Sequence, residues 1–374
     1  MTRFHTEGRD ADIGISVIIP NYNGGEVLKR CLISLLNQSF DKNKYEIIVV
    51  DNASKDRSIE IIREFAKKYP FIIRVILLPK NMGYGRAVNI GALFSKFNLI
   101  LVTNNDIIFY PKYLENLFNT YMLAKSHDRR IVAAQGLHLY YPEITRIYNA
   151  GGQLSLISGR YRFYGAQLSK KDFEKVMMLA RNGVKGFSYV AFANGAGALI
   201  EKDVFLRVGG FYRLYFSGIE EVDLGILLHL LGYRVIFIPS SILYHMEGYT
   251  LGGRSLYIPH KLYLIITGLY IQILSLYNTS SLIQALLIYF GLLASLPLLS
   301  FLKGDKSLVH VFLASSSFIF KATDSIKKRR GVIMSLSKEK FSEVVEFLKC
   351  KNKYIDIMQY LASLFIRRVL GKLP

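Results

Sequence analysis

Short apolar runs alternate with amphipathic stretches over the first hundred residues. The apolar runs predict buried strands over residues 15–20, 45–50, 71–78 and 99–103. Between these runs, apolar side chains recur every three or four residues, which predicts helices within residues 25–37, 51–69 and 85–97. This alternation is typical of an α/β fold with a mostly parallel, Rossmann-like sheet flanked by helices.

After residue 130 the pattern is less regular. Residues 131–141 and 234–239 read as strands, residues 150–167 as a loop or a hairpin, and residues 220–233 as a helix that ends at a glycine. A further strand and a short helix are expected within residues 189–211. We therefore assign residues 1–258 to one sheet-based domain.

The remainder, residues 259–374, has a different pattern. No charged residue or histidine occurs over the 41 residues 262–302, whereas one membrane-spanning helix needs about 20. A polar stretch at 277–281 divides this run, and lysines at both its ends would place both on the cytoplasmic side of a membrane. Amphipathic helices are expected over 338–349 and 354–370. The region is interpreted as a membrane-associated helical region, either a shallow hairpin or two spans. A buried subdomain or a homo-oligomer interface stays open.

The charge distribution narrows the class of partner. The formal net charge is +20, and residues 261–374 carry 16 Lys and Arg against 6 Asp and Glu. A basic chain favours an anionic partner, and basic residues beside apolar runs favour a membrane surface over nucleic acid. The sequence contains no helix-turn-helix, zinc-finger or RNP-like pattern, so no nucleic-acid partner is expected.

Polar residues gather where each of the first four predicted strands ends. The clusters are residues 21–23, 51–56, 80–86 and 104–106. The carboxyl ends of parallel strands share one edge of a sheet, and ligands bind there. Neither a G-x-G-x-x-G nor a P-loop motif is present, which argues against a dinucleotide or P-loop site. Carboxylate and amide oxygens suit Mg²⁺ or Mn²⁺, which bind diphosphates.

These stretches resemble a known family. "SVIIPNYN", "IIVVDNASKD", "NMGYGRAVNIG" and "NNDI", followed by "GIEEVDLGILLHLLGY", are similar to the successive motifs of family 2 glycosyltransferases with the GT-A fold. The nearest likeness is to the rhamnosyltransferase-like branch, and it covers roughly residues 14–260. The resemblance implies a nucleotide-diphosphate sugar donor, a divalent metal and inversion at the anomeric carbon.

The resemblance also implies roles for particular residues. Donor binding would fall to Pro20, Tyr22, Asn23, Asp51, Asn52, Arg86, Asn104 and Asn105. Asn104 stands where the family has the first aspartate of its metal-binding Asp-x-Asp motif, so Asp106 would carry most of the metal contact, helped by His245. The catalytic group would consist of Glu220, Glu221 and Asp223, with Glu221 as the base. The chain has no tryptophan, so the Gln-x-x-Arg-Trp motif of processive synthases is absent and single addition is favoured.

Each of these residues also has an ordinary structural explanation. Asp51 could cap a helix, and residues 104–106 could form an Asx turn. The acids at 220–223 could favour a helix N-terminus, Arg86 could be a solvated helix residue, and His245 could be a hydrogen-bonded core residue.

The leading hypothesis is a membrane-associated glycosyltransferase that adds one sugar to a hydroxyl of a lipid-linked or polysaccharide acceptor. Two alternatives stay open: a polyprenyl-phosphate sugar synthase, and a catalytically inactive scaffold that binds a nucleotide sugar. The expected location is the cytoplasmic face of the cell membrane.

Overall fold

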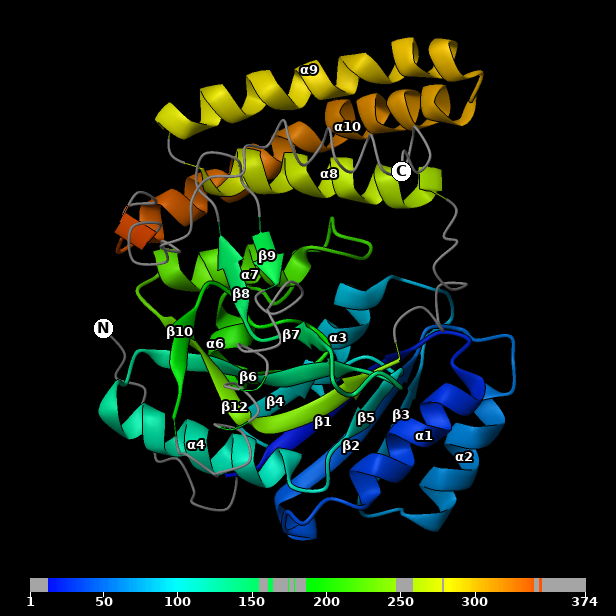
Figure 1. Cartoon of the computed structure of the whole chain (residues 1–374), viewed down its shortest axis with the longest axis vertical. Helices are drawn as coiled ribbons and strands as arrows, with labels where there is room; N and C mark the ends of the chain where they lie inside the picture. The colour runs from blue at the N-terminus through cyan, green and yellow to red at the C-terminus, as the bar shows by residue number, and fades with distance from the viewer. Residues whose placement is uncertain are drawn as a thin grey trace.

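The computed structural model describes residues 13–154, 161–163, 174, 178, 186–246, 258–277, 279–339 and 343–344. A mixed β-sheet with helices on both faces lies below a layer of three long helices (Figure 1). The main order of the sheet is β10-β12-β6-β11-β4-β1-β2-β3. The predicted α/β architecture is therefore confirmed.

The first four long strands are parallel, as the sequence predicts. They are β1 (Ile15–Asn21), β2 (Tyr45–Asp51), β3 (Ile73–Leu77) and β4 (Leu99–Val102). The connecting helices are α1 (Gly25–Leu36), α2 (Ser58–Lys68) and α3 (Tyr84–Leu93). Alternate side chains of β1 enter opposite cores: Val17 packs with residues of α1 and α2, and Ile18 packs with residues of α3.

Beyond β4 the sheet becomes mixed. Strand β11 (Ala198–Glu201) runs antiparallel to both β4 and β6 (Ile131–Tyr140), and β12 (Arg234–His245) returns parallel to β6. The shorter strands are β5 (Ile107–Phe109), β7 (Ile147–Asn149), β10 (Ser188–Val190) and the hairpin β8 (Gly152–Leu154) with β9 (Tyr161–Phe163).

Strand β12 is longer than predicted. The sequence predicts an end at residue 239, but a register shift between Ile238 and Ile242 lets the strand continue to His245. There it pairs with Ile107 at the start of β5. This extension brings His245 to the segment that follows β4.

Three helices cover the second half of the sheet: α4 (Tyr113–His127), α6 (Lys202–Arg207) and α7 (Glu220–Leu230). Helix α4 lies in a stretch to which the sequence analysis assigned no element. It buries Leu114, Leu117 and Tyr121 in the core beside α1. Helix α7 occupies the place predicted for residues 220–233.

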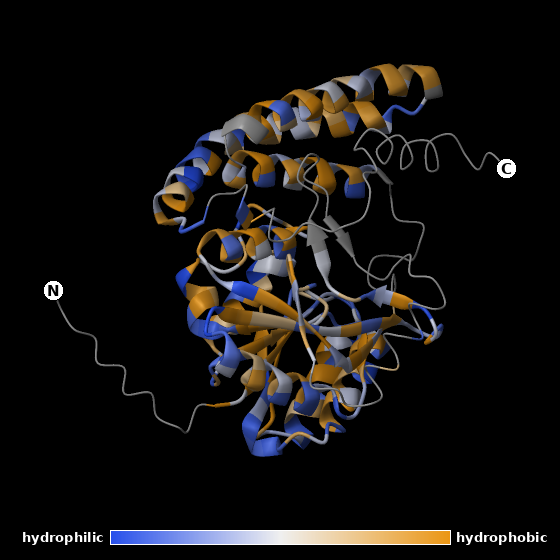
Figure 2. Ribbon diagram, turned by 60° about the vertical axis from the view of Figure 1, so that its left-hand side comes forward, coloured by the Kyte–Doolittle hydropathy of each residue, from blue (hydrophilic) through white to orange (hydrophobic). Residues whose placement is uncertain are grey.

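The C-terminal layer consists of α8 (Ile258–Leu276), α9 (Thr279–Lys303) and α10 (Ser307–Leu336). The predicted polar break separates α8 from α9, and α10 is one 30-residue helix. The predicted helix 354–370 and most of 338–349 lie outside the described residues. Tyr270 and Leu274 of α8 share a core with Val222 and Ile226 of α7, so the layer is packed onto the sheet domain (Figure 2).

Candidate active site

A chain of buried hydrogen bonds joins the carboxyl ends of three parallel strands. The Asn105 side chain, after β4, donates to Asn21 Oδ1 at 2.7 Å. Asn21, at the end of β1, donates in turn to Asp51 Oδ1 at the end of β2, at 2.8 Å. Ser54 donates to Asp51 from its backbone N–H and from its hydroxyl, at 2.8 and 2.6 Å. The side-chain amides of Asn105 and Asn21 therefore bind each other, and Asn21 and Ser54 fix the position of the Asp51 carboxylate.

The loop after β1 is bound to the loop after β2. Asn23 has a left-handed backbone (φ 52°), its N–H donates to Ser54 Oγ, and its side chain accepts from the Lys55 N–H at 2.8 Å. Pro20 is buried inside β1, while Tyr22 is 38% exposed beside this loop. A side chain on Gly24 would collide with the amides of both Asn21 and Asn105, so the pairing of those amides requires glycine there.

The loop after β3 is held in the same way. Asn52 accepts from the Met82 N–H at 3.2 Å and donates to the Gly83 carbonyl at 3.4 Å. Gly83 has φ 87° and begins α3. Arg86, exposed on α3, donates from Nε and Nη2 to the Arg213 carbonyl at 3.2 and 3.1 Å. Asp51 and Asn52 thus hold the loops that follow β2 and β3 at one sheet edge, whereas the Arg86 guanidinium is bonded to the Arg213 carbonyl.

Asp106 and His245 lie side by side, although 139 residues separate them in the sequence. Asp106 Oδ1 is 3.3 Å from His245 Nε2, and the Asn104 side chain is 3.4 Å from the same nitrogen. The Met246 N–H donates to the Asp106 carbonyl, which locks the end of β12 to this loop. The ring of Tyr148 lies 4.4 Å from the His245 ring, centre to centre.

The Asp106 and His245 side chains are suitable ligands for a hard divalent cation. One carboxylate and one imidazole are available side by side, and Mg²⁺ and Mn²⁺ complete their coordination with substrate phosphates and water. Among the described residues, no group of three or more His, Cys, Asp or Glu side chains could hold a metal ion. An ion bound here would therefore depend on the phosphates of a substrate, or on water, for part of its coordination.

Glu220 and Glu221 occupy the first turn of α7. Glu220 is buried, and burial together with the charge of Glu221 raises its pKa. Burial likewise raises the pKa of Glu221, which is the more exposed of the two. A carboxylate with a raised pKa can accept a proton near neutral pH, as a general base must.

Tyr84 lies near both the predicted metal ligand and the predicted base. Its hydroxyl donates to the Gly195 carbonyl at 2.6 Å. Burial raises the pKa of Tyr84 well above its usual value, and nearby carboxylates raise it further. These carboxylates belong to Glu220, Glu221 and Asp106. The predicted base and the predicted metal ligand therefore both lie within electrostatic range of the Tyr84 side chain.

Asp223, the third predicted catalytic acid, lies in a different environment. Both of its oxygens accept from Arg329 of α10, at 2.8 and 2.5 Å, and one also accepts from the Tyr215 hydroxyl at 2.9 Å. These bonds link α7 to α10. The sequence analysis did not single out Arg329, Tyr215, Tyr84 or Asn21, although Asn21 and Tyr84 lie within the predicted polar clusters 21–23 and 80–86.

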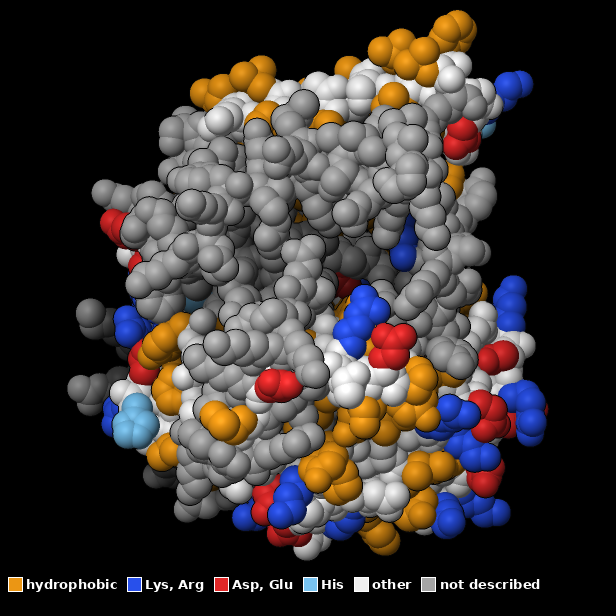
Figure 3. All heavy atoms as spheres, in the orientation of Figure 1, with side chains coloured by type: hydrophobic (Ala, Val, Ile, Leu, Met, Phe, Trp, Pro, Cys, Tyr) orange, Lys and Arg blue, Asp and Glu red, His pale blue; other side chains and the backbone are white. Residues whose placement is uncertain are grey.

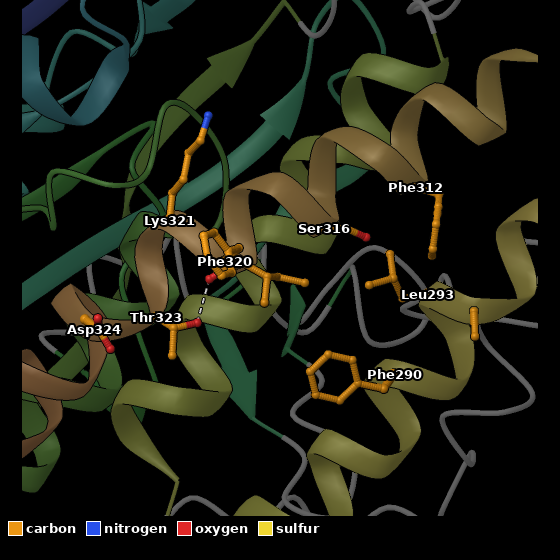
Figure 4. A pocket seen from close by; sticks show the side chains of 10 residues that line it. Phe290, Leu293, Phe312, Ser316, Phe320, Lys321, Thr323 and Asp324 are labelled. Atoms are coloured by element: carbon orange, nitrogen blue, oxygen red, sulfur yellow. Dashed lines mark hydrogen bonds between the residues drawn. The ribbon is translucent and has the colours of Figure 1, made fainter.

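A cavity of about 890 Å³ lies in the helical layer, between α9 and α10 (Figure 4). Phe290, Leu293, Phe312 and Phe320 line most of it, with Lys321 and Asp324 among its polar residues. Its size lies within the usual range for ligand pockets, about 300–1,000 Å³.

The first part of the chain is similar to known proteins. Residues 16–178 match the model of the family described as "Glycosyl transferase family 2". The probable glycosyltransferase YdaM of Bacillus subtilis is 26% identical over 233 residues, which is 62% of this chain and 50% of that protein. The poly(ribitol-phosphate) beta-N-acetylglucosaminyltransferase TarP of Staphylococcus aureus is 34% identical over 106 residues, 28% of this chain and 32% of that protein. The chain thus spans half or less of these relatives.

The fold has a solved counterpart. The mannosyltransferase PcManGT from Pyrobaculum calidifontis, solved with GDP-Man and Mn²⁺, matches with a TM-score of 0.50 and 15% identity. The match covers 96% of this chain and 88% of that one. The likeness confirms the predicted GT-A fold.

Proposed function

We propose that this chain, whose residues 16–178 match the model of glycosyltransferase family 2, transfers one sugar from a nucleotide-diphosphate sugar to an acceptor hydroxyl with inversion. The observation that carries the proposal is the meeting of the Asp51 network and the Asp106–His245 pair at one sheet edge. The two glutamates of α7 lie within electrostatic range of Tyr84, as Asp106 does. The assignment to the rhamnosyltransferase-like branch stays a prediction.

In this proposal the nucleotide lies across the loops after β1, β2 and β3. Asp51 would accept from a base N–H, and Arg86 would leave the Arg213 carbonyl to pair with a phosphate. Asp106 and His245 would hold Mg²⁺ or Mn²⁺, with Asn104 beside them. When bound, such an ion neutralises charge on a departing diphosphate.

Glu221 would act as the general base. The acceptor hydroxyl has a pKa far above neutral, so it needs to lose its proton as it attacks the anomeric carbon. Burial raises the pKa of Glu221 to about 7, in the range in which a base is effective, while burial and the charge of Glu221 raise the pKa of Glu220 further. With the diphosphate held on the opposite side of the sugar, attack in line with the departing group inverts the anomeric carbon.

We further propose that the acceptor is lipid-linked or a growing glycan and that the helical layer lies on the cytoplasmic face of a membrane. Residues 282–302 of α9 form the one segment, among the described helices, that is long and apolar enough to cross a membrane. Only 28% of it is buried, and its outer face exposes Ile283, Leu287, Leu298, Phe301 and Leu302. Apolar atoms gather along this edge of the surface (Figure 3).

The packing of α9 favours a position in the plane of the membrane. The inner stripe of α9, which includes Tyr289, Leu293 and Leu296, packs in the core shared with α8 and α10. A helix held lengthwise against two others presents one apolar face, and exposed Lys321, Lys327 and Lys328 could bind anionic head groups. The cavity between α9 and α10 could hold part of an acceptor's hydrocarbon chain.

The decisive experiment incubates the full chain with a panel of nucleotide sugars and Mg²⁺ or Mn²⁺ and measures release of the nucleoside diphosphate. We expect release with at least one donor and none with Asp106→Ala. Turnover by Asp106→Ala at the wild-type rate would show that the ion binds elsewhere. Binding of a donor by the wild type without release of nucleoside diphosphate would favour the inactive scaffold.

A further inference from the structure

The turn that introduces the two glutamates is strained. Ile219, directly before α7, has φ 59°, a left-handed conformation that is unfavourable for a β-branched residue. Such strain costs about 1–3 kcal/mol and persists only where the surroundings enforce it. Ile219 is buried against α8, where a side chain on Gly268 would come within 2.8 Å of its Cδ1. The C-terminal layer therefore packs directly against the residue that starts the catalytic helix.

One turn further on, α10 binds the same helix through an ion pair. Arg329 holds Asp223 with two nitrogens, and its guanidinium lies over the Tyr212 ring at 4.2 Å. The Asp223 side chain is 2% exposed and that of Arg329 is 13% exposed. A planar guanidinium that binds both carboxylate oxygens fixes orientation as well as position.

The chain after α10 binds the other end of α7. The backbone N–H groups of Lys338 and Glu339 donate to the Leu230 carbonyl at 2.8 and 3.1 Å. Glu339 also pairs with Arg234 at 2.6 Å. Both ends of α7 are therefore held by residues from the C-terminal region.

We propose that Arg329 is a positioning residue for Glu220 and Glu221, so that the C-terminal helical layer completes the catalytic centre. The inference rests on the proposed function, in which Glu221 is the base. The first turn of a helix has no intrahelical partners for its N–H groups, so its orientation depends on outside contacts. Asp223 lies in the same turn as the glutamates, and its bond to Arg329 is such a contact.

Arg329 also balances charge. The titratable and charged groups around the pair are Asp223, Tyr215, Tyr84, Asp106 and Arg329. Without Arg329, Asp223 would be a buried carboxylate with no cation bound to it, close to two others. Burial and the charge of Glu221 are the main causes of the raised pKa of Glu220, and the negative charge of Asp223 adds to them, so the neutralisation of Asp223 by Arg329 matters for Glu220.

The test compares Arg329→Lys with Arg330→Met in the full chain. Arg329→Lys keeps the positive charge and loses the two-nitrogen geometry. Arg330 is the matched control, because it donates to the carbonyls of Leu274 and Tyr277 at the end of α8 and not to α7. The measurements are kcat, the affinity for UDP, GDP and dTDP with Mn²⁺, and hydrogen exchange of residues 217–224.

We expect Arg329→Lys to lower kcat about 100-fold, the loss that a small misplacement of a reacting group produces. The affinity for the nucleotide should not change, because the hydrogen bonds that hold the loops after β1, β2 and β3 do not involve α10. Exchange at residues 217–224 should become faster in Arg329→Lys and not in Arg330→Met. Two further variants test the charge balance. In Asp223→Asn/Arg329→Met, which removes both charges, the acid limb of the pH profile should lie at lower pH than in Arg329→Met, which removes only the positive charge.

Equal kcat for the two single variants at the same folded fraction would overturn the proposal, and so would unchanged exchange at residues 217–224. Lack of turnover by the wild type with every donor would instead count against the proposed function. Hydrogen exchange would then still decide whether Arg329 orders the start of α7.

Discussion

The loops that would bind the donor and the helix that would carry the base are stabilised in different ways. In the loops, Asn21, Asp51 and Ser54 hydrogen-bond one another within two neighbouring segments. In the helix, the Glu220 carboxylate is buried, and one of its oxygens has no hydrogen-bond partner among the described residues. The donor side is thus held by a local network of hydrogen bonds, whereas the base side contains a strained turn and a buried carboxyl group.

The difference indicates what each half requires. A nucleotide needs a preformed surface, because ordering loops on binding costs affinity. A general base needs a raised pKa, and burying carboxylates close together achieves this at the expense of stability. Residues from α8 and α10 must then hold the helix in place, as Ile219 and Asp223 show.

The largest expected effect comes from the base itself. Glu221→Gln should lower kcat by about 10²–10⁴-fold, because an amide cannot accept the acceptor's proton. Donor affinity should stay near that of the wild type, because Glu221 lies outside the loops after β1–β3. Single-turnover transfer and equilibrium binding would separate the two quantities. A near-wild-type rate would favour a phosphate acceptor, which needs no base, and hence a polyprenyl-phosphate sugar synthase.

The next effect concerns the amide network. Asn21→Ala should reduce the free energy of unfolding by about 2–3 kcal/mol, because it leaves the buried Asn105 amide without its acceptor and removes one of the hydrogen bonds to Asp51. It should also weaken binding of the nucleoside diphosphate. The matched control is Asn116→Ala on α4, which removes a hydrogen bond to the Ser240 carbonyl of β12.

Denaturant unfolding and a nucleotide titration would measure both changes. Asn116→Ala should lose stability without losing nucleotide affinity. Equal affinity for Asn21→Ala and the wild type would show that the network does not shape the donor site.

Much of this arrangement could be predicted from the sequence, because it depends on local pattern. Apolar runs mark the strands, and the rule for parallel sheets places 51–56 and 104–106 at one edge. The Arg329–Asp223 link could not be predicted, since nothing in the run 327–330 distinguishes the one arginine that reaches α7. The orientation of Asn105 could not be predicted either, because its amide binds Asn21, a residue 84 positions earlier in the chain.

A smaller effect should follow from glycine substitutions. Gly24→Ala would place a methyl group against the Asn21 and Asn105 amides and should cost about 1–3 kcal/mol of unfolding free energy. Gly331→Ala on α10 is the control: nothing lies within 4 Å of the added carbon, and alanine favours a helix by about 0.5–1 kcal/mol. Thermal unfolding should therefore shift in opposite directions. A shift of the same sign in both variants would refute the steric explanation.

The smallest expected effect is a shift in pH dependence on the base side. Burial raises the pKa of Glu221, so activity should increase as pH rises through that pKa, above the usual carboxylate range. Burial and the charge of Glu221 raise the pKa of Glu220 above that of Glu221, so Glu220 is neutral when Glu221 titrates. Glu220→Gln, which is neutral at every pH, should therefore move the acid limb of kcat/KM only slightly. Glu115→Gln, on α4 and bonded to Ser39, is the control and should leave the limb unmoved. A large shift of the limb to lower pH in Glu220→Gln would show that Glu220 is charged when the base titrates.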